Sequence, residues 1–346
     1  MRSLILTGLA LALAWSIVAG AQAPPPPCTA AGDVQFICSQ QGPEDMVIVP
    51  GSQWVVASAM SGSGGINLIR VSDRSSVRAF PSESAHARFD AKAYVGCAGP
   101  PDAAARAKFI THGLSLEPGK KSVHRLLAVA HGSRESIEVF ELDAKPAVPV
   151  LTWIGCVVAP DPVGLNSVRW LPDGGFIATN FLARNVDAES RAKMLAGEKN
   201  GELWEWHVKT GWAKVPGSEA AGANGIEISE DGKTLYVAAW GSQSFFRLPR
   251  GVASPKRDEI PLGFRVDNIR WAKDGSLLAT GQGGTAPGSQ TTNVVKIDPK
   301  TLAVTELLRR PDVNGYGAGT VAVEIGKDLW VGSFRGDRIA IFPVVK

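Results

Sequence analysis

The chain has 346 residues, which is enough for a large hydrophobic core and, on length alone, for two domains. Its 36 lysines and arginines nearly balance 33 aspartates and glutamates, and the net charge is +3. No basic run or stripe stands out, so a nucleic-acid partner is not expected. The 38 glycines and 23 prolines are typical of a chain with many tight turns.

Residues 1–23 have the pattern of a cleavable secretory signal. Arg2 provides the charged start, Leu4–Val18 the apolar core and residues 21–23 (AQA) a cleavage site after Ala23. A membrane anchor is the alternative, but the apolar run is short and four prolines follow it. No later stretch is long and apolar enough to span a bilayer. We therefore expect an exported protein, secreted or periplasmic, without stable membrane insertion.

Export makes the four cysteines candidates for disulfides, and four cysteines allow three pairings. Cys28 and Cys38 lie close together in a proline-led N-terminal arm, residues 24–41. Cys97 and Cys156 flank the second of the repeats described below. We favour the pairs Cys28–Cys38 and Cys97–Cys156. The arm is expected to pack on the repeat domain or to complete its last unit.

A sequence motif that begins with a polar residue occurs six times along the chain. The clearest copy, residues 223–240 (ANGIEISEDGKTLYVAAW), contains Asn224, a short alternating strand, an Asp-Gly turn and an apolar strand. The other copies begin at Asp45, His112, Asn166, Asn268 and Thr320. Spacings of roughly 40 to 70 residues lie at or slightly above the range that indicates propellers. We therefore predict an all-β fold, a six-bladed β-propeller over residues 42–346.

One helix is predicted outside the leader, at Asp187–Gly197 (DAESRAKMLAG). Its composition favours a helix, Asn185 precedes it as a possible cap, and Gly197 ends it. Because this segment follows the Asn166 repeat, it is an insertion between strands. It is either a lid over the mouth of the ring or a solvated surface helix, and both interpretations remain open.

The innermost strands of a propeller run in one direction, so residues at equivalent ends meet at one mouth of the channel. The residues that begin the repeats are Glu44, Asp45, His112, Asn166, Asn224, Asp267, Asn268 and Thr320. A single Asn or Asp has a simpler explanation, because both residue types cap turns. Oxygen side chains at one register in four blades instead indicate a hard cation, since such a cluster is costly to bury alone. Calcium fits best, because it accepts about six to eight oxygens in loose geometry.

Two histidines, His112 and His131, are expected on adjacent strands near this mouth. Such a pair can form a relay in which one ring activates water and the other orients it or passes on its proton. The alternative for each is an ordinary structural histidine. The other three histidines (His86, His124 and His207) have no such placement.

From about Gly42 onward, the sequence resembles the paraoxonase/arylesterase family, within the wider group of SMP-30/gluconolactonase propellers. The motifs that carry the resemblance are PED from Pro43, THGLS from Thr111, AHGSRESIEVFEL from Ala130, LNS from Leu165, ANGIEISEDGKTLYVA from Ala223 and VDNI from Val266. Each motif alone is weak, but all six occur in the family's order.

The resemblance implies a calcium-dependent hydrolase of lactones and aryl esters. Calcium in the channel would polarise the substrate carbonyl while water activated at His112 attacks it. His112 and His131 would match the family's histidine pair. By the same resemblance, the calcium ligands would be Glu44, Asn166, Asn224, Asp267 and Asn268.

The sequence departs from the family in two places. A second calcium would use Asp45 and the Leu114 carbonyl, but Ser167 stands where the family has an aspartate, which weakens this site. The family's disulfide between the N- and C-terminal regions has no counterpart either, because no cysteine follows Cys156.

Two alternative functions remain open. A gluconolactonase-like sugar lactonase would share the metal site and differ in the wall of the pocket. A non-catalytic, calcium-stabilised propeller would bind a partner on one face, and it would not need His112 at the metal. The expected partner of the leading hypothesis is a small ester or lactone, and the oligomeric state is not predicted.

Overall fold

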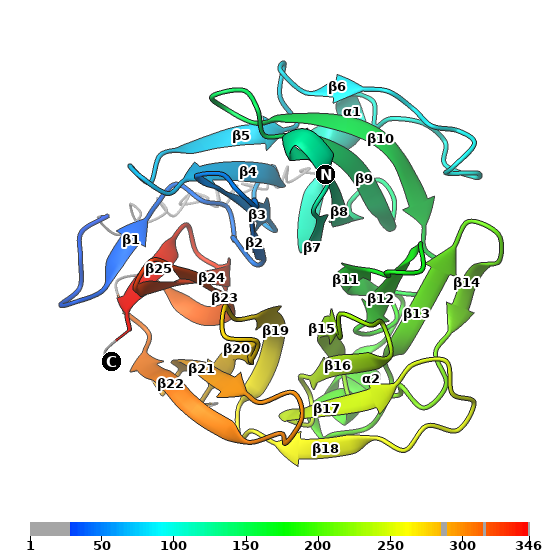
Figure 1. Ribbon diagram of the computed structural model, residues 1–346. Helices are drawn as coiled ribbons and strands as arrows, with labels where there is room; N and C mark the ends of the chain where they lie inside the picture. The colour runs from blue at the N-terminus through cyan, green and yellow to red at the C-terminus, as the bar shows by residue number, and fades with distance from the viewer. Residues whose placement is uncertain (1–27, 285–288, 314–315, 345–346) are drawn as a thin grey trace, which may run out of the picture.

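The computed structural model describes residues 28–284, 289–313 and 316–344, so the predicted leader lies outside the described residues. In this part of the chain, six sheets surround one axis as the blades of a propeller (Figure 1). The innermost strands β2, β7, β11, β15, β19 and β23 surround the central opening. The predicted six-bladed β-propeller is confirmed.

Each blade is built on a meander of three or four strands that are consecutive in the sequence. Blade one contains β2 (Met46–Ile48), β3 (Trp54–Ala59), β4 (Gly65–Arg70) and β5 (Ser76–Phe80). Blade two contains β7 (Ile110–Glu117), β8 (Val123–His131), β9 (Ser136–Asp143) and β10 (Val150–Val158), with β6 (His86–Ala87) parallel to β10. Blade three contains β11 (Leu165–Trp170), β12 (Phe176–Asn180), β13 (Glu202–His207) and β14 (Gly211–Lys214).

The remaining blades follow the same plan. Blade four contains β15 (Ala223–Ile228), β16 (Thr234–Ala239), β17 (Ser244–Pro249) and β18 (Asp258–Pro261). Blade five contains β19 (Arg265–Trp271), β20 (Leu277–Gly283), β21 (Thr291–Ile297) and β22 (Val304–Pro311). Blade six contains β23 (Gly317–Ile325), β24 (Asp328–Arg335) and β25 (Ile339–Pro343).

The N-terminal arm supplies the fourth strand of blade six. Strand β1 (Gln35–Ile37) pairs antiparallel with β25, and Phe36 lies opposite Ala340. The arm therefore completes the last blade, one of the two placements expected from the sequence. Both ends of the described chain meet in this blade (Figure 1).

Apolar side chains fill the space between neighbouring blades. Phe80, Phe109 and Phe140 pack edge to face between blades one and two, with ring centroids 4.7 and 5.0 Å from the central Phe80. Phe80 lies in β5 and Phe140 in β9, and successive side chains of a strand point to opposite faces of its sheet, so one face of each strand packs against the adjacent blade.

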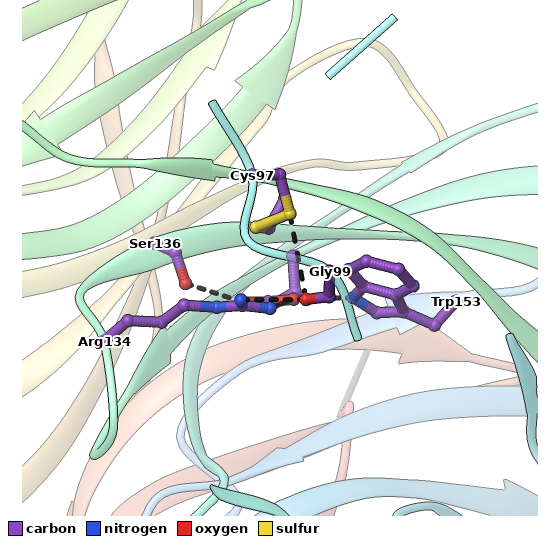
Figure 2. Close-up of a disulfide and its surroundings, with 7 residues drawn as sticks. Cys97, Gly99, Arg134, Ser136 and Trp153 are labelled. Atoms are coloured by element: carbon purple, nitrogen blue, oxygen red, sulfur yellow. Dashed lines mark hydrogen bonds and ion pairs between the residues drawn. A yellow bond between two sulfur atoms is a disulfide. The ribbon is translucent and has the colours of Figure 1, made fainter. Parts of the chain in front are cut away.

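Both expected disulfides form, Cys28–Cys38 and Cys97–Cys156. The second fixes a loop beside the hairpin between β8 and β9, where Arg134 donates to the Gly99 carbonyl over 3.0 Å (Figure 2). The same guanidinium pairs with the buried carboxylate of Glu138. This hairpin is therefore anchored immediately after His131.

The predicted helix is α2 (Ala188–Leu195), and its N-cap is Asp187, whose carboxylate accepts from the Ser190 N–H. Asn185 was therefore the wrong cap, because the helix begins two residues later. A second helix, α1 (Ala103–Arg106), and a 3-10 turn at Lys120–Ser122 were not predicted. Within the described ranges, no helix is long and apolar enough to cross a bilayer.

Candidate metal and active site

In five of the six blades, the polar residues that begin the repeats lie at irregularities of the innermost strands. In blades two to six, the pairing of the innermost strand with its neighbour shifts register at this point. Such β-bulges free residues from the regular ladder and redirect their side chains. The polar residues within the shifts are His112, Asn166, Ser167, Asn224, Asp267, Asn268 and Thr320.

Two of the bulges place a glycine after the polar residue, where the next inner strand approaches closely. A Cβ at Gly113 would lie 2.5 Å from the Asn166 carbonyl oxygen, and one at Gly225 would lie 2.4 Å from that of Asp267. Glycine therefore allows neighbouring inner strands to bring their polar side chains together at the axis.

The five predicted metal ligands are all buried, with 1 to 5% of each residue exposed. Asn268 donates to Glu44 Oε1 over 2.6 Å, although the two residues are 224 positions apart. The Thr320 hydroxyl donates to the Glu44 backbone carbonyl over 2.6 Å, so Thr320 positions Glu44. Above the cluster is a cavity of about 400 Å³, whose lining includes Asn166, Asn224 and Asp267.

Four buried oxygens of this cluster have no hydrogen-bond partner among the described residues. They are Glu44 Oε2, Asn166 Oδ1, Asn224 Oδ1 and Asn268 Oδ1. Buried polar atoms without partners are rare and cost free energy. Because the four oxygens come from four different blades and are all acceptors, the residues present fit a hard cation such as calcium.

Electrostatics lead to the same conclusion. Burial raises the pKa of Glu44 to about 8, and the neighbouring Asp45 contributes to this rise. Burial also raises the pKa of Asp267 well above its usual range, with the charge of Glu44 as the next cause. Two such carboxyl groups ionise together only when a positive charge compensates them. In the described ranges, no group of three or more His, Cys, Asp or Glu is arranged to hold a metal ion, so a bound ion would depend on amide oxygens.

The two predicted histidines lie beside this cluster and in contact with each other. His112 Nδ1 lies 3.1 Å from His131 Nε2. On its other side, His112 Nε2 lies 3.2 Å from Asn166 Nδ2 and 3.6 Å from Glu44 Oε1. Burial lowers the pKa of His112, which favours its neutral form.

Glu135 extends this pair to a chain of three groups. Its Oε2 lies 2.8 Å from His131 Nδ1, and its Oε1 accepts from the Leu165 N–H over 2.7 Å. A carboxylate can only accept a hydrogen bond, so His131 donates from Nδ1 to Glu135. His131 Nε2 then accepts a hydrogen bond from the Nδ1–H of His112. The lone pair of His112 is then on Nε2, facing the cluster. Sequence reasoning missed Glu135, although the motif AHGSRES places it four residues after His131.

The proposed second calcium residues contact arginines. Asp45 pairs with Arg270 and accepts from the Leu114 N–H over 2.7 Å. The Leu114 carbonyl accepts from Arg169 over 2.7 Å and from Arg270 over 3.3 Å. Glu227 lies 2.9 Å from Arg169 and completes the buried group. Two guanidinium groups therefore supply positive charge at the place where the resemblance would put a second ion.

Apolar side chains and helix α2 form the wall of the cavity. Phe181, Trp240, Phe334 and Met60 line it, together with Arg191, Met194 and Leu195 from α2. Met194 is buried and packs with Leu182 and Ala221. The helix is therefore part of the cavity wall, although most of its other residues face solvent.

No family model and no curated protein sequence matches the chain. Solved structures do match it. A luciferin-regenerating enzyme has a TM-score of 0.56 at 13% identity, over 90% of this chain and 95% of that one. A gluconolactonase from Xanthomonas campestris has a TM-score of 0.55 at 16% identity, over 94% and 96%. The calcium-binding protein regucalcin from Agrobacterium tumefaciens has a TM-score of 0.51 at 13% identity, over 90% and 92%. At these identities, the chain shares the fold of these proteins.

Proposed function

We propose that the protein is an exported, calcium-dependent hydrolase of lactones or aryl esters. The observation that carries this proposal is the set of four unpartnered oxygens from four blades beside a neutral histidine whose Nε2 lone pair faces them. The names of the structural neighbours, a gluconolactonase, a luciferin-regenerating enzyme and a calcium-binding protein, support both parts of it. The two disulfides support export to an oxidising compartment.

In this proposal, the metal ligands are Glu44, Asn166, Asn224, Asp267 and Asn268. Calcium held there would polarise the substrate carbonyl and stabilise the oxyanion that forms from it. Asn166 would have two functions, because its unpartnered Oδ1 would bind the ion while its Nδ2 contacts His112.

His112 is the proposed general base. Its Nε2 takes a proton from water, whose oxygen attacks the carbonyl carbon of the substrate. The acyl C–O bond then breaks, and the proton passes from His112 to the leaving alkoxide. His131 accepts the Nδ1 proton of His112 in a hydrogen bond and, held by Glu135, keeps the base in this orientation.

The cavity wall favours an apolar substrate over a sugar lactone. Phe181, Trp240 and Phe334 present aromatic surface to the cavity, which suits an aryl or aliphatic group. A gluconolactone would have to satisfy several hydroxyl groups against this wall. The sugar lactonase therefore remains the second candidate.

The test is hydrolysis of phenyl acetate, δ-valerolactone and gluconolactone with calcium and with excess chelator. We expect calcium-dependent turnover, with the two apolar substrates preferred. His112→Gln should remove turnover while calcium still raises the melting temperature. If calcium stabilises the protein but no ester or lactone is hydrolysed, the non-catalytic calcium-stabilised propeller is the better description.

A further inference from the structure

Three arginines gather at the mouth of the cavity. Arg191 of α2 and Arg335 at the end of β24 line the cavity above the metal cluster. Arg265 at the start of β19 and Arg335 line an adjoining cavity of about 530 Å³. The two cavities share Leu195, Trp240, Phe334 and Arg335 in their linings, so they lie side by side.

These arginines form no ion pair within the described part of the chain. None of the three lies within ion-pair distance of a described carboxylate, whereas many other arginines of this chain do. Arg335 interacts electrostatically with Asp312, but the pKa of Asp312 is still raised, mainly by burial. The mouth therefore carries an excess of guanidinium groups.

Arg265 is the clearest case, because part of its guanidinium is buried. Its Nη1 is inaccessible to solvent and has no hydrogen-bond partner among the described residues. Burial also lowers the pKa of Arg265, which reflects the cost of keeping this charge away from water. An anion in the cavity cannot touch this buried atom, but it would bind the remaining donors of the guanidinium and offset its partly buried charge.

The position of Arg265 is fixed relative to the metal cluster. Its guanidinium lies over the Trp240 ring, 4.3 Å from the centroid. The Trp240 indole donates to Gln282 Oε1 over 2.9 Å, and Gln282 donates from Nε2 to Asp267 Oδ2 over 2.7 Å. These contacts connect the mouth directly to a proposed calcium ligand.

We propose that the natural substrate is a lactone or ester that carries a carboxylate at the end remote from the reacting carbonyl. The carboxylate would bind Arg265 and Arg335, the apolar body would lie against Trp240 and Phe181, and the carbonyl would reach the metal cluster. Arginine suits this recognition because its planar fork donates two parallel hydrogen bonds to a carboxylate. This inference rests on the proposed function for the reacting end of the substrate, but the anion site itself does not depend on turnover.

The first test compares kcat/KM for mono-phenyl glutarate, which carries the carboxylate, with kcat/KM for neutral phenyl acetate. We expect wild type to prefer the anionic ester and Arg265→Gln and Arg335→Gln to lower this preference about tenfold each. The control is Arg309→Gln, since Arg309 is exposed and pairs with Glu306 away from the mouth. It should leave the preference unchanged. Equal turnover of the two esters by wild type would overturn the inference.

The second test measures binding without turnover. Titration calorimetry with 3-phenylpropanoate and with neutral 3-phenylpropanol compares an anionic with an uncharged ligand of the same shape. We expect wild type to bind 3-phenylpropanoate at least tenfold more tightly than 3-phenylpropanol. Arg265→Gln should lose this difference in affinity, and Arg265→Lys should retain part of it. If the carboxylate binds in this way but no ester is hydrolysed, the anion site stands and the proposed hydrolase fails. If esters are hydrolysed but the carboxylate binds no better than the alcohol, the anion site fails alone.

Discussion

His131 Nδ1 lies 2.8 Å from Glu135 Oε2, while the other oxygen of the same carboxylate accepts from the Leu165 N–H of the next blade. One carboxyl group therefore holds a histidine of blade two against the backbone of blade three. This contact determines which ring nitrogen of His131 carries a proton and, through His131, which ring nitrogen of His112 does.

Glu135→Gln tests this relay with almost no change in shape. The glutamine amide can keep the bond to the Leu165 N–H, but its NH₂ would donate to His131 Nδ1. Both tautomers would then reverse, and His112 would carry a proton on Nε2 where the base is needed. We expect kcat to fall by on the order of 10²-fold or more, with the reversal visible in the ¹⁵N NMR shifts of the histidine side chains.

The control for this variant is Glu141→Gln, because Glu141 pairs with Arg88 on the outer part of the same blade. It should retain kcat and the tautomers of wild type. Glu135→Asp should retain part of the activity, since it keeps an acceptor. Unchanged kcat in Glu135→Gln would contradict the relay.

Removing one amide ligand should weaken calcium binding without unfolding the ring. Asn224→Ala removes one of the four unpartnered oxygens, so the calcium affinity should fall while the metal-free protein stays folded. Calcium at about 100 times its Kd stabilises wild type by about 2.7 kcal/mol, and Asn224→Ala should lose most of this gain. Calorimetric titration and thermal unfolding measure both effects. The matched control is Asn185→Ala on the exposed segment before α2, and a loss of affinity in that variant would point to an unspecific effect.

The stability of the chelated protein should fall as pH rises. The pKa of Glu44 is raised by burial from 4.5 to about 8. Between pH 4.5 and about pH 8, Glu44 is therefore protonated in the folded state and ionised in the unfolded state. Its contribution to stability is therefore complete below pH 4.5 and is lost as pH approaches 8. The raised pKa of Asp267 acts in the same direction. Calcium should oppose this loss, so the difference in melting temperature between calcium and chelator should widen from pH 5 to pH 8. A constant difference would show that these carboxyl groups do not bind the ion.

The buried arginines predict a stoichiometry of one calcium ion per chain. Arg270 pairs with Asp45, and Arg169 pairs with Glu227, so charges that belong to the chain itself balance these carboxylates. Native mass spectrometry should detect one bound ion, and two would contradict this interpretation. Arg270→Met should lower the free energy of unfolding by about 3–5 kcal/mol, because it leaves Asp45 buried without its partner. Arg309→Met on the surface should change it by about 0.5 kcal/mol or less.

The sequence predicted the polar residues of the site because each one begins a repeat, and equivalent positions of repeats meet at the axis. It did not predict the bulges, since a register shift depends on the partner strand and leaves no local pattern. Glu135 was missed for a similar reason, because its function depends on a backbone N–H in another blade. The buried arginines had a usable signal. Arg169 and Arg270 each stand three residues after Asn166 and Asp267, at the register that Glu227 occupies after Asn224.

The pairing of β1 with β25 has a consequence for the order in which the protein assembles. Strand β1 can pair with β25 only after β25 has been synthesised, so the ring stays open until this late part of the chain has been made. The Cys28–Cys38 bond ties the early strand only to itself, across a separation of 10 residues, and Cys97–Cys156 lies in blade two. Within the described residues, neither disulfide joins β1 to β25, so non-covalent contacts hold these two strands together. We expect a closed ring to open first at this pairing.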